Sequence, residues 1–111
     1  MMSQAAAAGV IGLLLTALVS AATAAPGDFV LPRKGASAGA EQFPLAAFPH
    51  TLHRVLFKCY VCHDSLFKMK VGADAMTMDA MGDGKFCGAC HDGKTTFDTS
   101  SFDNCDRCHQ K

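Results

Sequence analysis

The chain has 111 residues, enough for one domain, and its ten basic and ten acidic residues give a formal net charge of zero. No excess of Lys and Arg marks a basic surface, so nucleic acid is excluded as a partner. Half of the residues are apolar, but much of this content lies in an uncharged, Ala- and Leu-rich opening over residues 1–25.

The opening segment has the organisation of a secretory signal peptide. An apolar run covers residues 10–19, and a membrane-spanning helix needs about 20 apolar residues. An A-x-A cleavage site follows at residues 22–24. We therefore expect a signal peptide over residues 1–24 and export of residues 25–111 to the periplasm. No Cys lies near the cleavage site, so no lipid anchor is expected. The segment begins without Lys or Arg, which leaves an uncleaved anchor as the alternative.

The mature part predicts a small, mainly α fold with little regular secondary structure. Extended stretches at residues 28–31 and 41–45 predict a short N-terminal β-hairpin. Pro49 favours the start of a helix that runs over residues 50–58. Further short helices are expected around each Cys cluster and at residues 79–81.

One short motif recurs three times and uses every Cys of the chain. The copies are Cys59-Tyr60-Val61-Cys62-His63, Cys87-Gly88-Ala89-Cys90-His91 and Cys105-Asp106-Arg107-Cys108-His109. C-x-x-C-H is the attachment sequence of c-type haem. Two thiols one helical turn apart can bind the two vinyl groups of a porphyrin, and the next residue brings an imidazole to the iron. We therefore predict three covalent haems c, with the Cys side chains as attachment points and His63, His91 and His109 as proximal ligands.

Other uses of six Cys explain the pattern less well. Disulfides are common in small exported chains, but they give no reason for a His after every second Cys. Paired C-x-x-C can hold structural zinc, which requires neither a His in every copy nor export. A thiol–disulfide exchange site has one C-x-x-C within a βαβ unit, which this chain lacks.

Two further histidines, His50 and His53, are candidate distal ligands. At positions i and i+3 of a helix their Cβ atoms lie about 5–6 Å apart. Two rings that leave one helix so close together cannot serve the same iron, so we expect them to bind two different haems. Those two haems would then lie nearly in contact. The alternative is that both side chains are simply solvated on an amphipathic helix.

Five His leave one of the six axial positions without a His ligand. Met76, Met78 and Met81 precede the second motif, and a Met thioether is an established sixth ligand that raises the reduction potential. We expect Met81 in this role because it is nearest to the motif, with Met78 as the alternative. Otherwise these Met side chains fill gaps against porphyrin faces.

The haems would also supply the core that the side chains lack. Several Phe side chains are expected to pack on the porphyrins. They are Phe48, Phe57, Phe67, Phe86, Phe97 and Phe102. We expect the chain without haem to be largely unfolded.

From about Asp28 to Lys111 the chain resembles the triheme cytochrome c7 family of the cytochrome c3-like group. The marks are Phe48-Pro49-His50-Thr51-Leu52-His53, the three C-x-x-C-H motifs and Gly84-Lys85-Phe86-Cys87-Gly88-Ala89-Cys90-His91. The resemblance implies a short hairpin and a few helices around three close haems. It also pairs His50 with the haem of His63, and His53 with that of His91. The third haem, at His109, would take its distal ligand from just before the second motif.

The chain departs from the best-known members at that last position. They have a His shortly before the second motif, where this chain has Asp83. The stretch Thr77-Met78-Asp79-Ala80-Met81 instead resembles a His/Met variant found in c7-type domains of multidomain cytochromes. Its balanced charge also differs from the Lys-rich soluble members.

We expect a periplasmic electron-transfer protein, not an enzyme, that relays electrons in anaerobic respiration. Its partners would be other redox proteins: membrane quinol-linked donors, multihaem cytochromes, terminal reductases or extracellular acceptors. It would be a monomer or a subunit of a larger redox complex. The alternative is a haem enzyme or small-ligand sensor, in which no Met binds and the third iron is five-coordinate. No motif places an acid–base group beside such an open site.

Overall fold

The computed structural model describes residues 25–111, so the expected signal peptide over residues 1–24 lies outside the described part. The elements in chain order are β1 Phe29–Val30, η1 Ala40–Gln42, β2 Ala47–Phe48, α1 His50–Leu56, α2 Cys59–Cys62, α3 Met78–Gly82, η2 Phe86–Ala89, η3 Phe102–Asn104 and α4 Cys105–Cys108, where η denotes a 3₁₀ helix. The longest of these has seven residues. This agrees with the predicted small fold of short helices, one hairpin and little other regular structure. In the described part, no helix has the length and apolar character needed to cross a membrane.

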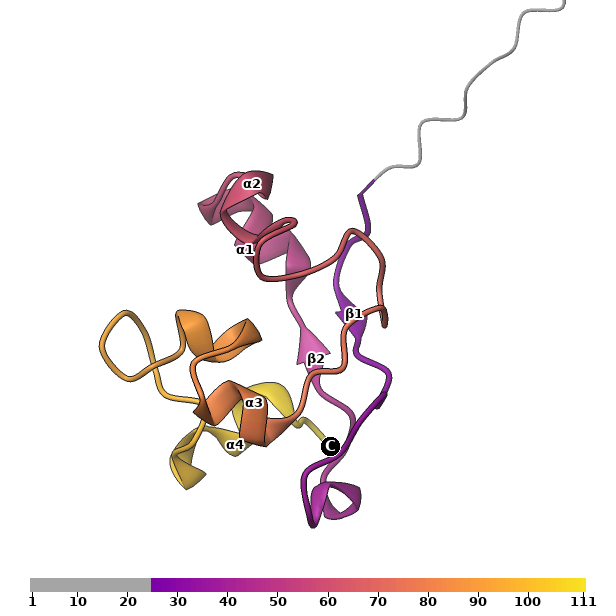
Figure 1. The fold of residues 1–111 in the computed structure, drawn as a ribbon, viewed down its shortest axis with the longest axis vertical. Coiled ribbons are helices and arrows are strands. Elements are labelled where there is room, and N and C mark those ends of the chain that lie inside the picture. The colour runs from indigo at the N-terminus through magenta and orange to yellow at the C-terminus, as the bar shows by residue number, and fades with distance from the viewer. Residues whose placement is uncertain (1–24) are drawn as a thin grey trace, which may run out of the picture.

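Figure 1 shows α1 and α2 at one end of the described domain, the two strands beside them, and α3 and α4 at the other end. The strands are antiparallel, with Phe29 paired to Phe48 and Val30 to Ala47. The predicted strand partner at residues 41–45 is wrong. Gly39, at φ 80°, starts a 3₁₀ turn over Ala40–Gln42 instead, and Pro44 has no N–H to offer a partner strand. The pairing therefore moves towards helix α1.

Helix α1 begins at His50 as predicted but ends at Leu56, because Phe57 is extended at φ −132°. Pro49 precedes the helix, and no side chain next to it caps the first turn. The cap comes from outside the helix: Asp28 Oδ1 accepts a hydrogen bond from Thr51 N at 2.8 Å. The segment before β1 therefore stabilises the first turn of α1.

Helix α3 is capped twice. Thr77 Oγ1 accepts from Ala80 N at 3.1 Å, and Ser37 Oγ, from the N-terminal part of the chain, accepts from Asp79 N at 3.0 Å. The helix packs on η2, where a Cβ at Gly88 would overlap the carbonyl group of Met81. Gly88 is buried, and its lack of a side chain permits this close approach.

The described side chains form no hydrophobic core of their own. Among residues 25–111 no hydrophobic side chain is buried, and several large ones are strongly exposed. Val55 and Tyr60 are each 78% exposed, and Phe102 is 89% exposed. Phe102 was expected to pack on a porphyrin, and its own chain leaves it almost fully accessible. A folded domain of this size needs another source of apolar contact.

Candidate haem-binding sites

Each C-x-x-C-H motif folds as one short helical turn that ends at its His. The first motif contains α2, the second overlaps η2, and the third contains α4. The same backbone hydrogen bond closes all three, from the N–H of the His to the carbonyl of the first Cys, at 2.8 to 2.9 Å. The three motifs therefore share one local geometry, the one expected when two thiols and an imidazole address one porphyrin.

The proximal histidines are all anchored through Nδ1. The ring nitrogen lies 2.9 Å from Phe67 O in His63, 3.1 Å from Phe97 O in His91 and 2.7 Å from Pro44 O in His109. A carbonyl oxygen only accepts hydrogen bonds, so Nδ1 must carry the proton. That tautomer leaves the lone pair on Nε2, the nitrogen that an iron would bind.

The two candidate distal histidines are anchored in the same way. His50 Nδ1 donates to Pro26 O at 2.7 Å, and His53 Nδ1 donates to Pro49 O at 3.0 Å. A histidine that is only solvated has no need of a fixed tautomer. The shared tautomer therefore favours the ligand role over the solvated alternative for both residues.

The rings of His53 and His91 lie at the separation expected for two ligands of one iron. Their centroids are 6.4 Å apart, with planes tilted by 49°. A metal–imidazole bond is about 2.0 Å long, so two imidazoles on opposite sides of one metal have centroids separated by roughly 6.3 Å. Phe48 packs on both distal candidates, with ring centroids 4.6 Å from His53 and 5.8 Å from His50. The residues present therefore fit the second haem.

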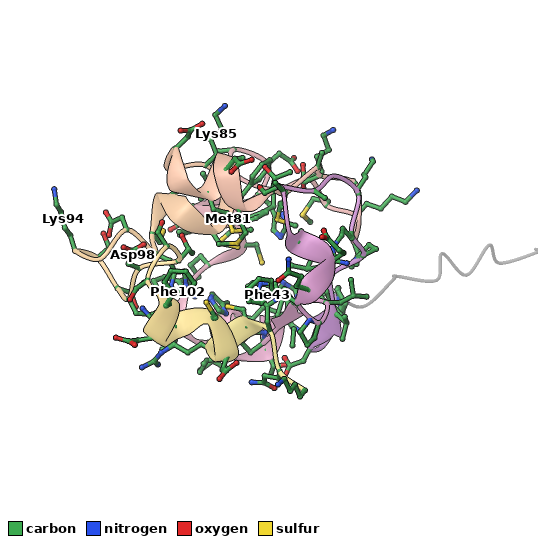
Figure 2. The ribbon with its side chains drawn as sticks, turned by 90° about the horizontal axis from the view of Figure 1, so that it is seen from below. Phe43, Met81, Lys85, Lys94, Asp98 and Phe102 are labelled. Carbon is green, nitrogen blue, oxygen red and sulfur yellow. The ribbon has the colours of Figure 1, made fainter. Side chains whose placement is uncertain are left out.

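The structure distinguishes the Met candidates by exposure and direction. Met78 is 39% exposed, whereas Met81 and Met76 are half-buried. Figure 2 shows Met81 directed towards the interior of the ribbon, as Phe43 is, while Lys85 and Lys94 point outward. Phe43 contacts His109, with ring centroids 5.5 Å apart. This favours Met81 over Met78 as the side chain available to the third haem.

The cysteines form neither disulfides nor a metal cluster within the described residues. Burial raises the pKa of Cys87 to about 11, and the nearby thiol of Cys108 and, more weakly, that of Cys62 add to the shift. Burial is also the main reason that the pKa values of Cys62 and Cys108 are raised. These three thiols come from three different motifs, so the motifs converge. At neutral pH the thiols are protonated and slow to enter disulfide exchange.

Several contributors to the sites carry no sequence signal. Pro26 and Pro44 act through backbone carbonyls, which every residue possesses. Phe43 was not expected to contact any ligand, and it reaches His109 from a distant part of the chain. Only the tertiary structure brings these groups to the histidines.

Three helical turns with the C-x-x-C-H pattern, five histidines of one tautomer and a domain without its own core together define a multihaem c-type cytochrome. Residues 46–110 match the family described as cytochrome c7 and related cytochrome c, and the chain belongs to this family. Its members are typically electron carriers rather than enzymes. The chain is thus a haem-binding cytochrome of electron transport.

Solved structures agree with this assignment. A c7-type three-heme cytochrome domain is 40% identical at a TM-score of 0.63, over 76% of this chain and 93% of that domain. The C-terminal hexaheme fragment of GSU1996 is 40% identical at a TM-score of 0.61, over 76% of this chain and 48% of the fragment. The dodecaheme cytochrome c GSU1996 is 40% identical at a TM-score of 0.62, over 77% of this chain but only 24% of its own length. No curated protein matches the chain.

Proposed function

We propose that residues 25–111 carry three covalent c-type haems and that the protein relays electrons between redox partners in the periplasm. The observation that carries this proposal is the common tautomer of the five histidines, each with Nδ1 held by a backbone carbonyl and Nε2 left for iron. No histidine is left over for acid–base chemistry, which favours electron transfer over catalysis.

Each proposed haem would be attached through two Cys side chains and would be ligated by two further residues. Cys59 and Cys62 hold the first, Cys87 and Cys90 the second, and Cys105 and Cys108 the third. The irons would be held by His63 with His50, by His91 with His53, and by His109 with Met81. When bound, the haems supply a reversible one-electron ferric/ferrous couple. The protein's part is to orient the imidazoles through their carbonyl partners and to place the haems close together.

The His/Met pair should differ from the two His/His pairs. A thioether donates less electron density to iron than an imidazole, so the haem of His109 should have the highest reduction potential. Three fully ligated irons have no open position for a substrate. The chain would then exchange electrons at haem edges without binding a small molecule, which separates it from a haem enzyme or a ligand sensor.

The proposed location and partners rest on the opening segment and on the relatives. The apolar run and A-x-A site over residues 10–24 favour export to the periplasm. There, membrane quinol-linked donors, multihaem cytochromes and reductases are the expected partners. Two of the similar structures are named as hexaheme and dodecaheme cytochromes. That supports action beside other multihaem units, either as a free monomer or as a subunit of a larger complex.

The first experiment measures the mass and the ferric spectra of the matured protein, beside Met81→Ala and Met78→Ala variants. We expect the mass of the chain plus three haems, and a methionine–iron charge-transfer band that Met81→Ala removes and Met78→Ala retains. A mass with fewer than three haems would contradict the proposed cofactor content. A high-spin, five-coordinate iron in the parent would instead support an enzyme or sensor. Loss of the band only in Met78→Ala would move the ligand to that residue.

A further inference from the structure

The loop between the second and third motifs folds back onto the second proximal ligand. Thr99 N donates to His91 O at 3.2 Å, and Gly93 N donates to Thr96 O at 3.0 Å, so the loop returns to its starting point. Phe97 lies within it and contacts His91 twice. Its carbonyl accepts from His91 Nδ1 at 3.1 Å, and its ring centroid lies 4.3 Å from that of the imidazole.

A residue of the third motif holds Phe97 from another side. The guanidinium carbon of Arg107 lies 4.7 Å from the Phe97 ring centroid, within the range of a cation–π contact. Arg107 Nε also donates to Asn104 Oδ1 at 2.9 Å, and Asn104 Nδ2 donates to Asp98 O at 2.9 Å. The guanidinium is therefore fixed by its aromatic contact and by a hydrogen bond, although Arg107 itself is exposed.

We propose that Arg107 is a positioning residue for the second haem, acting through Phe97 on the His91 imidazole. This rests on the proposed function, because His91 must ligate an iron for its orientation to matter. Haem c attachment leaves the two residues between the cysteines free to vary, so the motif does not require an Arg at this place. In this chain Arg107 occupies a variable position of the third motif and, through Phe97, contacts His91, the proposed proximal ligand of the second haem.

Two physical effects follow from this contact. The stack restrains the Phe97 ring and, through it, the plane of the His91 imidazole, which sets how its π orbitals meet the iron. The positive charge also disfavours the oxidised iron, since ferric haem carries one more positive charge than ferrous haem. Arg107 should therefore restrict the rotation of the His91 imidazole, an effect specific to the haem at Cys87 and Cys90. Its charge should raise the reduction potential of that haem and of the haem at Cys105 and Cys108, the residues on either side of Arg107.

The test compares Arg107→Met with Lys94→Met in the matured protein. Both variants remove one positive charge near the loop. Among the described residues, Phe97 makes its cation–π contact with Arg107 and not with Lys94, and Figure 2 shows Lys94 pointing outward. The readouts are the haem count by mass, the ferric low-spin g values and the midpoint potential of each haem, assigned by NMR. We expect Arg107→Met to move the g values of the second haem only. It should lower the midpoint potentials of the second haem and of the third, because Arg107 lies between Cys105 and Cys108 and its charge acts on Cys108. Lys94→Met should leave the g values unchanged.

Two further variants separate positioning from charge alone. Arg107→Lys keeps the cation over the ring and should remain close to the parent in potential. In a Phe97→Leu background, Arg107→Met should add no further change in g values. Equal g values in Arg107→Met and Lys94→Met, or the full Arg107→Met effect without Phe97, would overturn the proposal. If Arg107→Met does not mature, Arg107→Gln gives the same comparison. Failure of the proposed function is distinct, since the parent itself would then lack the second haem.

Discussion

Two regions of the chain orient the histidines in different ways. In the motif region, residues 59–111, His63 and His91 donate to carbonyls of the loops that directly follow their own motifs. His109 donates instead to Pro44 O in the N-terminal segment, residues 25–49, across 65 positions of sequence. The imidazoles of the first two motifs are therefore oriented by acceptors that lie close to them in sequence. The imidazole of the third motif is oriented by an acceptor in the N-terminal segment.

The N-terminal segment serves the two distal candidates as well. His50 donates to Pro26 O and His53 to Pro49 O, so three of the four prolines provide acceptors for histidines. Proline lacks an N–H and interrupts regular pairing, which leaves its neighbourhood outside helices and ladders. The carbonyls of Pro26 and Pro44 are then available to a side chain, whereas the carbonyl of Pro49 also accepts the backbone N–H of His53 at 3.2 Å. The comparison indicates that this segment orients His50, His53 and His109, the proposed ligands of three different haems.

We expect the largest effect when residues 25–45 are removed from the mature protein. This deletion tests whether the N-terminal segment orients the histidines. The motifs, His50, His53 and Pro49 remain, but the acceptors at Pro26 and Pro44 and the strand β1 are lost. We expect changed ferric low-spin signals for the haems of His63 and His109, because their ligands His50 and His109 lose their acceptors. The haem of His91 should change least, because His53 and His91 keep their acceptors at Pro49 and Phe97, although α1 loses its cap at Asp28. Low-spin spectra and thermal unfolding measure this, and equal change in all three haems would contradict the comparison.

A second prediction concerns the packing within the motif region. Gly88→Ala places a Cβ against the carbonyl group of Met81, whose carbonyl carbon would lie 2.7 Å away. Because the obstacle is backbone, the structure must shift, at a cost on the order of 1–3 kcal/mol in the free energy of unfolding. Gly82→Ala is the matched control, as nothing lies within 4 Å of its added Cβ. Denaturant unfolding with equal midpoints for the two variants would refute the close approach.

Helix α3 is capped from both regions, so the contribution of each region to its stability can be compared. Thr77 caps it from the motif region, and Ser37 caps it from the N-terminal segment. Loss of a helix cap costs about 1 kcal/mol, so Thr77→Ala and Ser37→Ala should each lower the free energy of unfolding by about that amount. The double variant should be close to additive, because the two hydroxyls accept from different N–H groups. Denaturant unfolding measures all three, and no effect of Ser37→Ala would mean that the segment does not support α3.

The smallest effect is a dependence on pH at Asp28. The hydrogen bond from Thr51 N lowers the pKa of this carboxyl below its usual value of about 3.9. A lowered native pKa means that the carboxylate stabilises the folded state above about pH 4, and that this is lost as pH falls through the native pKa. Asp28→Ala should therefore melt at a lower temperature than the parent at pH 7.

The difference between parent and Asp28→Ala should shrink when melting is repeated at progressively more acid pH. Asp28→Asn keeps a hydrogen-bond acceptor without the charge, so its difference from the parent should be smaller at pH 7. A difference between Asp28→Ala and the parent that stays constant down to strongly acid pH would show that the carboxylate does not cap α1.

The sequence was sufficient to predict the elements whose formation depends on residues close together in the chain. The three helical turns of the motifs, the start of α1 at His50 and the short helix at Met78–Gly82 follow from local spacing and residue type. The existence of the hairpin also followed, but its pairing did not. The partner of β1 is Ala47–Phe48, since the turn at Gly39 and the proline at position 44 displace it from residues 41–45.

Only the tertiary structure decided how the ligands are held. The carbonyl partners of His50 and His109, the contact of Phe43 with His109 and the stack of Arg107 on Phe97 join positions from 10 to 66 residues apart. Every residue has a backbone carbonyl, so the sequence does not indicate which carbonyl accepts a hydrogen bond from a histidine. An aromatic residue in the sequence likewise does not indicate which ring it will contact. Local chemistry therefore determined which residues can bind haem, and the long-range path of the chain determined how each imidazole is oriented, because orientation depends on groups that sequence spacing does not bring together.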